Sequence, residues 1–457
     1  MNKLSMRIVS GWISINIGHY DYFYDSKNKR FVVMENNYDT NSISKLNEER
    51  LKKIIPPVNY EILPNFAEPA NLSCITITGK CNMNCPYCFV YPVPKMKNMS
   101  VSTAISAVKA LKKQSDKHLT IYLWGGEPSL NPKALIAACN EGQKHERLSL
   151  ILTSNGVFSD ELFDKIIQVD NLIFQISFDG IKEQNNQKLL TNKNSLPIVL
   201  NRMKSINRLN KKIILRSTVT KNNISNILNG LGLIKDLTKT YMIEHVHTYV
   251  GRSQNQKTQE PNINDYGQVI MKLLYETEQF GINLLTPTLE GLRLSSPPKW
   301  GFINILPDKY LSVTNSIIDS SNPMFKLLSI GKLKRKKIVI SLKKVKKMHD
   351  NYIRNVNIYC DNCIAKPICR GGIQRDLFCS QANITMFDDT RCKYYKSVLA
   401  QWILSIIPSI NSCLKQEGLR EGMILLKNNN KDKNFFPLLV HKNGLKVICD
   451  KSFICPH

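Results

Sequence analysis

The most informative stretch of the sequence is Cys81-Asn82-Met83-Asn84-Cys85-Pro86-Tyr87-Cys88. It follows an apolar, β-branched run, Ile75-Thr76-Ile77-Thr78, which predicts a strand that ends at Gly79. Three thiolates at this spacing can each bind one iron of a cubic [4Fe–4S] cluster. No further cysteine follows until Cys139. One iron therefore keeps an open coordination position, which is a property of catalytic metal sites.

A zinc site is the main alternative interpretation of the Cys-x2-Cys pair in this loop. Structural zinc needs four ligands, which usually come from two such pairs or from one pair and two histidines. No second pair lies near residues 81–88, and the next histidine downstream is His118. The iron–sulfur interpretation is therefore favoured for this loop.

Length and composition place the chain among ordinary globular proteins. Its 457 residues suffice for two or three domains, and 42% of them are hydrophobic. No run approaches the roughly 20 apolar residues that span a bilayer, and the N-terminus lacks a signal-peptide pattern. We therefore expect a cytoplasmic protein with no membrane association. Its 13 cysteines are then expected to be metal ligands and free thiols rather than disulfides.

The net charge of +27 arises partly from the general composition and partly from two basic runs, Lys332–Lys337 and Lys343–Lys347. Such runs attract polyanions, whether nucleic acid or an acidic peptide. A solvated basic face without a dedicated partner explains them equally well. The charge therefore does not identify a partner.

Strand and helix patterns alternate between residue 72 and about residue 285. The strand candidates are 74–79, 119–124, 148–153, 172–178, 212–220 and 241–249, and the helical stretches between them are 101–114, 132–145, 159–168, 196–208 and 223–236. Six β/α units predict an α/β fold with a parallel sheet and outer helices, either doubly wound or a barrel. In (β/α) barrels the chemistry lies at the carboxyl ends of the strands, where most of the motifs below fall.

Cx3CxxC after a first strand resembles the radical S-adenosylmethionine (radical SAM) enzymes, in which the open iron takes the amino and carboxylate groups of SAM. The resemblance implies a partial (β/α)6 TIM-like barrel and two cofactors, a [4Fe–4S] cluster and SAM. It extends to Gly125-Gly126-Glu127-Pro128, which is similar to the family's GGEP motif, a contact of the cofactor's amino group. Two glycines in a row more often form a turn. Because they lie one β/α unit after the cysteines, a cofactor-binding site is favoured over a simple turn at these glycines.

The resemblance also implies SAM contacts at the next strand ends. Ser154 and Asn155 lie where the family's third strand faces the cofactor ribose, although a capped strand-to-helix turn explains them equally well. Ser177 and Asp179 match the family's Ser-x-Asp-Gly, whose serine binds the carboxylate end of the cofactor. Tyr87 completes the expected contacts.

Three other polar residues on these units have simpler explanations. Lys188 could substitute for an arginine that family members often carry after Ser-x-Asp-Gly. Arg216 lies inside the fifth strand, where a salt bridge within the barrel is favoured over a ligand contact. His245 and His247 are read as core or surface histidines.

A second cysteine group, Cys360, Cys363 and Cys369 followed by Cys379 and Cys392, supplies a complete set of four thiolates. Four thiolates also suit zinc, so the residues alone leave both metals open. The spacing resembles the SPASM extension of peptide-modifying radical SAM enzymes, which holds two auxiliary clusters.

The chain departs from the SPASM pattern consistently. Ile373 and Thr314, the latter at the end of a strand pair over 303–314, stand where the pattern has cysteines. All missing ligands belong to one cluster. The resemblance therefore implies a shortened "twitch" extension with one auxiliary [4Fe–4S] cluster. Its expected ligands are Cys360, Cys363, Cys369 and Cys392, with Cys379 as the competitor for the fourth place.

Four domains are expected. Residues 1–70 carry a hairpin signal and a helix over 42–53 and form a candidate peptide-docking module. Residues 71–290 form the radical SAM core, residues 295–400 the twitch/SPASM-like domain, and residues 401–457 a helical or irregular tail.

The resemblance implies an enzyme that cleaves SAM to methionine and a 5′-deoxyadenosyl radical. The expected substrate is a ribosomally made peptide or protein, modified by cross-linking, epimerisation or oxidation. The expected partners are that precursor and an electron donor such as flavodoxin or ferredoxin; nucleic acid is less favoured. The alternatives are a sulfatase-maturing (formylglycine-forming) enzyme, an RNA-modifying or small-molecule radical SAM enzyme, and a non-catalytic iron–sulfur regulator. The residues that move protons are not identified.

Overall fold

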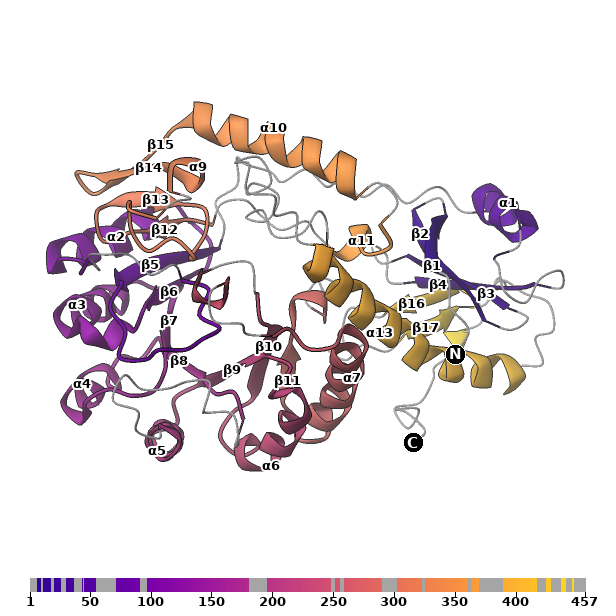
Figure 1. Ribbon diagram of the computed structural model, residues 1–457, viewed down its shortest axis with the longest axis horizontal. Coiled ribbons are helices and arrows are strands. Elements are labelled where there is room, and N and C mark those ends of the chain that lie inside the picture. The colour runs from indigo at the N-terminus through magenta and orange to yellow at the C-terminus, as the bar shows by residue number, and fades with distance from the viewer. Residues whose placement is uncertain are drawn as a thin grey trace.

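The structure is a computed structural model of the chain. It describes residues 6–9, 11–17, 20–25, 30–36, 43, 45–54, 71–90, 97–180, 195–247, 251–254, 259–289, 302–322, 325–360, 363–369, 389–416, 425–428, 437–440 and 446–447. Figure 1 shows a large α/β body and a smaller body that contains the N-terminal strands. Among the described residues, no helix combines the length and the apolar character that crossing a membrane requires.

The large body is built on parallel strands. These are β5 (Leu72–Thr78), β6 (Leu119–Gly125), β7 (Leu148–Ser154), β8 (Leu172–Ser177), β9 (Ile213–Val219), β10 (Thr240–His245) and β11 (Asn283–Leu285). They lie side by side in sequence order, and every neighbouring pair is parallel. The two end strands do not pair with each other, because β5 has β12 as its other neighbour. The predicted partial barrel and its six strands are confirmed, although the sixth, predicted over 241–249, ends at His245, and residues 248–249 lie outside the described residues.

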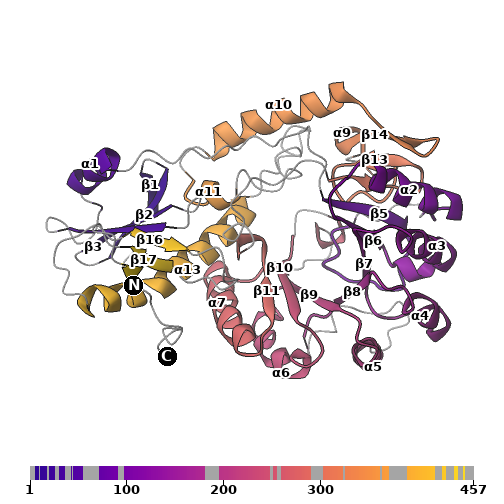
Figure 2. The same ribbon diagram turned by 180° about the vertical axis from the view of Figure 1, so that it is seen from behind.

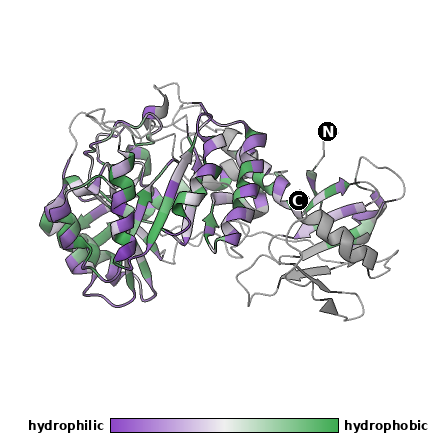
Figure 3. Cartoon of the chain, turned by 90° about the horizontal axis from the view of Figure 1, so that it is seen from below, coloured by the Kyte–Doolittle hydropathy of each residue, from purple (hydrophilic) through white to green (hydrophobic). Residues whose placement is uncertain are grey.

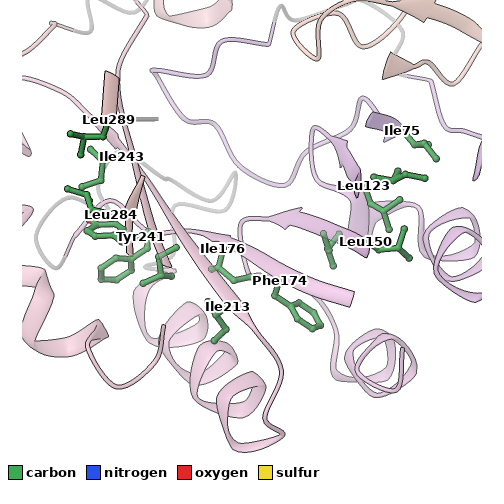
Figure 4. Close-up of a cluster of buried hydrophobic side chains, with 14 of the residues drawn as sticks. Ile75, Leu123, Leu150, Phe174, Ile176, Ile213, Tyr241, Ile243, Leu284 and Leu289 are labelled. Carbon is green, nitrogen blue, oxygen red and sulfur yellow. The ribbon is translucent and has the colours of Figure 1, made fainter. Parts of the chain in front are cut away.

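Helices cover the outer face of this sheet (Figure 1). They are α2 (Val101–Lys113), α3 (Pro132–Gly142), α4 (Asp160–Ile166), α5 (Leu196–Arg208), α6 (Leu231–Ile234) and α7 (Ile263–Gln279). Alternate strand residues such as Ile75, Leu123, Leu150 and Phe174 are fully buried against them (Figure 4). The helices carry both green and purple segments in Figure 3, as amphipathic helices do.

One predicted helix, over 223–236, is broken. Two 3-10 turns, η3 (Ile224–Asn226) and η4 (Leu228–Gly230), precede the short α6. The Asn223 side chain accepts a hydrogen bond from the Thr220 amide at 2.7 Å and donates one to the Thr218 carbonyl at 2.8 Å. Because asparagine side chains compete in this way for backbone groups, they favour turns over a continuous helix.

Further strands extend the sheet beyond β5; the first of them pairs parallel with β5, and the later pairs are antiparallel. They are β12 (Asn304–Ile305), β13 (Tyr310–Ser312), β14 (Ser329–Lys334) and β15 (Lys337–Ile340), with α9 (Phe325–Leu328) before β14. The predicted strand pair over 303–314 is confirmed, because β12 and β13 pair antiparallel. After β15 come α10 (Leu342–Tyr359) and α11 (Lys366–Cys369), which bring in the second cysteine group.

The small body contains an antiparallel sheet of β1 (Met6–Val9), β2 (Trp12–Ile17), β3 (Tyr20–Asp25) and β4 (Arg30–Glu35), followed by α1 (Lys45–Ile54). The hairpin signal corresponds to β3 and β4. The Asp21 carboxylate, fully buried, accepts hydrogen bonds from the amides of Asn16, Asn36 and Asn47 at 2.9, 3.0 and 2.9 Å. The bond from Asn47 ties α1 to the sheet.

A long helix, α13 (Asp389–Gln416), joins the two bodies. Figures 1 and 2 both show it running from α7 to the N-terminal sheet. Ser397 on α13 donates to the Ile263 carbonyl at 2.8 Å, and Trp402 further along contacts Tyr24, with ring centroids 5.2 Å apart. Three short strands follow, β16 (Leu425–Asn428), β17 (Pro437–Val440) and β18 (Lys446–Val447), in the region expected to be helical or irregular.

Candidate iron–sulfur active site

The three cysteines of the first motif lie in the loop that leaves the carboxyl end of β5, called here the cluster loop (residues 79–90). Cys81, Cys85 and Cys88 are all partly buried free thiols. The Cys88 amide donates to the Cys85 carbonyl at 3.3 Å, which closes a turn around Cys-Pro-Tyr-Cys. The thiols act on one another electrostatically, so they are close in space as well as in sequence.

Burial raises the pKa of all three thiols, that of Cys81 to about 12. Glu127 raises the pKa of Cys81 further, and Arg252 lowers the pKa of Cys81 and Cys88. Iron binds the thiolate, so cluster assembly must displace these protons. Among the described residues, no three His, Cys, Asp or Glu side chains are placed to hold a single metal ion. In a cubic cluster each thiolate instead binds a different iron.

Gly125 and Gly126 pack directly against the start of the cluster loop. A Cβ on Gly125 would lie 2.1 Å from the Thr78 carbonyl oxygen, and one on Gly126 would lie 2.3 Å from that of Lys80. The Gly126 and Glu127 amides donate to the same two carbonyls at 2.9 and 2.7 Å. These glycines therefore let the cluster loop approach the end of β6 closely, and their contact with SAM stays a prediction.

A single methyl group at position 126 should therefore displace the cluster loop. We expect Gly126→Ala to lower the free energy of unfolding by about 2–3 kcal/mol, as overpacking against backbone does, and to reduce the iron bound per chain. Gly232→Ala is the matched control, because nothing lies within 4 Å of its Cβ position. Denaturant unfolding and iron analysis of both variants test this, and equal iron in both would contradict it.

Glu127 connects the strand ends on which SAM contacts are expected. It is fully buried, and its carboxylate accepts hydrogen bonds from the Ser129 amide at 3.1 Å, the Ser154 hydroxyl at 3.0 Å and the Asn155 amide at 2.8 Å. Burial raises its pKa, and these bonds oppose the shift. Asn155 in turn donates to the Asn82 side chain at 2.7 Å. Glu127, Ser154 and Asn155 thus form one support under the cluster loop, and their contacts with SAM stay a prediction.

A second support lies at the end of β8. The Tyr87 hydroxyl of the cluster loop donates to the buried Asp179 carboxylate, which also accepts from the Thr218 amide at 2.8 Å. Ser177 is partly exposed at the end of β8. The structure thus brings Tyr87 and Asp179 together, as a shared site would require. Lys188 lies outside the described residues.

Polar and aromatic residues gather beside the cluster loop on the inner face of the sheet. Arg216 pairs with Glu244 at 3.0 Å, which confirms the predicted salt bridge, and its guanidinium carbon lies 5.9 Å from the ring centroids of Phe89 and Trp124. Those two rings stack, with centroids 5.5 Å apart. Glu244 also contacts His247, with 3.1 Å between Oε1 and Nε2. His247 and the nearby His245 are both buried, as predicted for core histidines.

The second cysteine group comes from the segment between α10 and α11, from the end of α11 and from α13. Cys360 is buried, and Cys363, Cys369 and Cys392 are partly buried free thiols. Burial raises the pKa of Cys360 to about 12, with Cys363 and Cys392 contributing in the same direction. Cys363 and Cys392 are therefore near Cys360, although they lie on separate segments of the chain. Cys379 lies outside the described residues.

Two residues at the site were not identified from the sequence. Gly251 and Arg252, in η5 (Gly251–Gln254), contact the backbone of Cys85, Cys88 and Phe89. Arg252 is 167 positions from Cys85. No local pattern signals that separation, although a glycine followed by a cation at the end of a barrel strand is a weak indication.

A sequence model of the radical SAM superfamily matches residues 75–232 of the chain. These residues include the cluster loop, the Gly-Gly-Glu support and the strand ends described above. The chain contains a radical SAM domain. Such a domain uses a [4Fe–4S] cluster and SAM, and the residues present fit the cluster, because the loop offers three free thiols on a rigid support.

Curated relatives of this chain include anaerobic sulfatase-maturating enzymes of the cysteine type. One from Clostridium perfringens (strain 13 / Type A) is 29% identical over 129 residues, which are 26% of this chain and 35% of the relative. The chain thus matches about a third of that relative's length. One from Clostridium novyi (strain NT) is 22% identical over 70% of this chain and 91% of the relative.

Two solved structures share the fold. Native anSMEcpe with bound AdoMet has a TM-score of 0.56 and 17% identity, covering 76% of this chain and 99% of that one. Streptococcus suis SuiB bound to S-adenosylmethionine has a TM-score of 0.51 and 11% identity, covering 86% and 98%. The likeness extends past the radical SAM domain, because it covers well over the 158 residues from 75 to 232.

Proposed function

We propose that this chain reductively cleaves SAM and uses the resulting 5′-deoxyadenosyl radical to modify a ribosomally made peptide or protein. The observation that carries the proposal is the three-thiol loop at the carboxyl end of a partial barrel, inside a radical SAM domain. When bound and reduced, the cluster supplies the electron that cleaves SAM. The likeness to the SPASM-type maturases anSME and SuiB supports the maturase class.

The residues around the loop have distinct tasks in this proposal. The three thiolates hold the cluster, and the Glu127 and Asp179 supports fix the loop that carries them. The Phe89–Trp124 stack places an apolar wall beside the loop, and such a wall keeps water from a reactive radical. The Arg216–Glu244 pair is a charged group near that wall and could orient a polar part of the substrate.

A peptide is the favoured substrate class. One solved structure with a TM-score of 0.56 to this chain, native anSMEcpe, has both AdoMet and the Cp18Cys peptide bound. The exposed lysines and arginine of the turn between β14 and β15 and of the start of α10 suit an acidic peptide segment or an acidic electron donor such as flavodoxin or ferredoxin. The four thiols of the second group would hold the auxiliary [4Fe–4S] cluster, and with no open iron it would serve in electron transfer.

Formylglycine formation on a sulfatase is the second candidate, because the curated relatives reported above are sulfatase-maturating enzymes. The second cysteine group counts against it. Thr314, where the two-cluster pattern has a cysteine, is a buried hydroxyl that contacts Ser316, with 3.0 Å between the oxygens. A chain with one auxiliary cluster departs from the two-cluster pattern.

The proposal is tested with anaerobically reconstituted full-length protein, dithionite and SAM. We expect 5′-deoxyadenosine to form and a short peptide encoded beside the gene to change mass in the same reaction. A cysteine-containing sulfatase peptide serves as the second substrate. Conversion of that peptide alone would replace the first candidate by the second. Absence of 5′-deoxyadenosine from iron-loaded protein would contradict both and favour a non-catalytic regulator.

A further inference from the structure

We propose that Gly251 and Arg252, called here the η5 clamp, hold the second half of the cluster loop in place and favour the reduced state of its cluster. The two residues follow β10, on the far side of the sheet from β5, where the loop begins. The proposal rests on the loop thiols binding the cluster. It does not depend on which substrate the enzyme modifies.

Arg252 binds the backbone of two expected ligand residues. Its amide donates to the Cys88 carbonyl at 2.8 Å, and its Nη1 donates to the Cys85 carbonyl at 3.3 Å. Both bonds leave the thiols free for iron. One residue therefore fixes the relative position of the two cysteines of the Cys-x2-Cys pair.

Gly251 makes this approach possible. A Cβ at position 251 would lie 2.4 Å from the Phe89 carbonyl carbon and 2.5 Å from the Cys88 carbonyl oxygen. Its φ of +64° is also in the left-handed region that glycine adopts readily. No other residue fits both the backbone conformation and the contact.

The clamp completes a three-point attachment of the loop. Glu127 and its neighbours at β6 and β7 hold the first half, and Asp179 after β8 holds Tyr87. Without the clamp, the segment around Cys88 and Phe89 would lose its attachment to the β10 side of the sheet. A loop that is attached only on the β6 to β8 side should open locally more often, and a cluster bound to it should then lose iron faster.

The charge of Arg252 adds a second effect. The guanidinium lies against the loop that carries the thiols, with its Nη1 3.3 Å from the Cys85 carbonyl oxygen. A cluster gains one negative charge when it is reduced, and a fixed cation nearby stabilises that state relative to the oxidised one. Removal of the cation should therefore move the midpoint potential to a more negative value.

Two substitutions of Arg252 separate the attachment from the charge. Arg252→Lys keeps the cation but loses the planar guanidinium, so we expect iron release to a chelator about tenfold faster with little change in midpoint potential. Arg252→Gln removes the cation as well, so we expect faster release and a more negative potential. Arg208→Gln is the matched control, because Arg208 is exposed at the end of α5. Potentials are measured by redox titration of the electron paramagnetic resonance signal that responds to SAM.

The glycine has its own matched pair. Gly251→Ala should lower the iron bound after reconstitution by at least about twofold, because the methyl group would push the loop away. Gly281→Ala carries nearly the same strain, with φ +63°, but its Cβ position has nothing within 4 Å. We expect Gly281→Ala to bind as much iron as the parent protein.

Equal iron-release rates and equal potentials in the two Arg252 variants and the Arg208 control would overturn the η5 clamp. A lower melting temperature of the Arg252 variants with unchanged release and potential would also overturn it, since that result describes a purely structural residue. Neither readout uses a peptide. These measurements can therefore refute the clamp without refuting SAM cleavage and peptide modification. Likewise, a failure to modify a peptide would not refute the clamp.

Discussion

Replacement of Cys81, Cys85 and Cys88 together by alanine should reduce 5′-deoxyadenosine formation by at least about a thousandfold, because the cofactor and not a side chain supplies the electron. The bound iron should fall by about four atoms per chain, the content of one cubic cluster. Substrate modification should disappear with it. Iron analysis, chromatography of 5′-deoxyadenosine and mass spectrometry of the peptide measure the three effects.

Cys139→Ala is the control for this triple variant. Cys139 is fully buried in α3, away from the cluster loop, so its loss removes a thiol without removing a ligand. We expect it to keep the iron and turnover of the parent protein, with a stability loss of about 1 kcal/mol for the missing sulfur. Turnover by the triple variant at the rate of the control would contradict the assignment of the loop.

The double variant Cys360→Ala with Cys363→Ala should separate SAM cleavage from peptide modification. Both thiols belong to the second cysteine group, between α10 and α11, and lie far along the chain from the radical SAM domain. We expect the bound iron to fall by about four atoms per chain. SAM cleavage should stay within about threefold of the parent rate, and product formation should be lost because the substrate radical has no electron acceptor.

A metal analysis of the same double variant decides between iron and zinc at the second group. A loss of bound zinc with iron unchanged would contradict the auxiliary cluster. If Cys392→Ala binds as little iron as the double variant, Cys392 is supported as the fourth ligand. If it binds as much iron as the parent protein, Cys379 is favoured as the fourth ligand instead.

The sequence predicted the sheet well because each β/α unit carries its own signals. Apolar β-branched runs mark the strands, and capped amphipathic runs such as Val101–Lys113, with Ser100 as N-cap, mark the helices. The broken helix at 223–236 shows the limit of periodicity. Its apolar spacing is helical, but side-chain hydrogen bonds of Asn223 to nearby backbone groups turned the segment into 3-10 turns.

Candidate site residues were found where a motif is local and missed where the contact is distant. The cluster loop is one continuous segment, and so are the residues from Gly125 to Glu127. Each segment could therefore be identified from its residue types alone. Their roles needed the fold, because the contact between Gly126 and Lys80 joins two strand ends. The η5 clamp joins residues 164 and 167 positions apart and has no sequence signature.

The central claim is that one iron of the cluster bound by Cys81, Cys85 and Cys88 has no protein ligand and takes SAM. Electron paramagnetic resonance of the reduced full-length protein, with and without isotope-labelled SAM, tests it most directly. The account predicts that SAM changes the signal of one cluster and that the labelled amino and carboxylate groups couple to it magnetically. If the signals of all reduced clusters were unchanged by SAM and none showed coupling to the labelled groups, the claim would be contradicted.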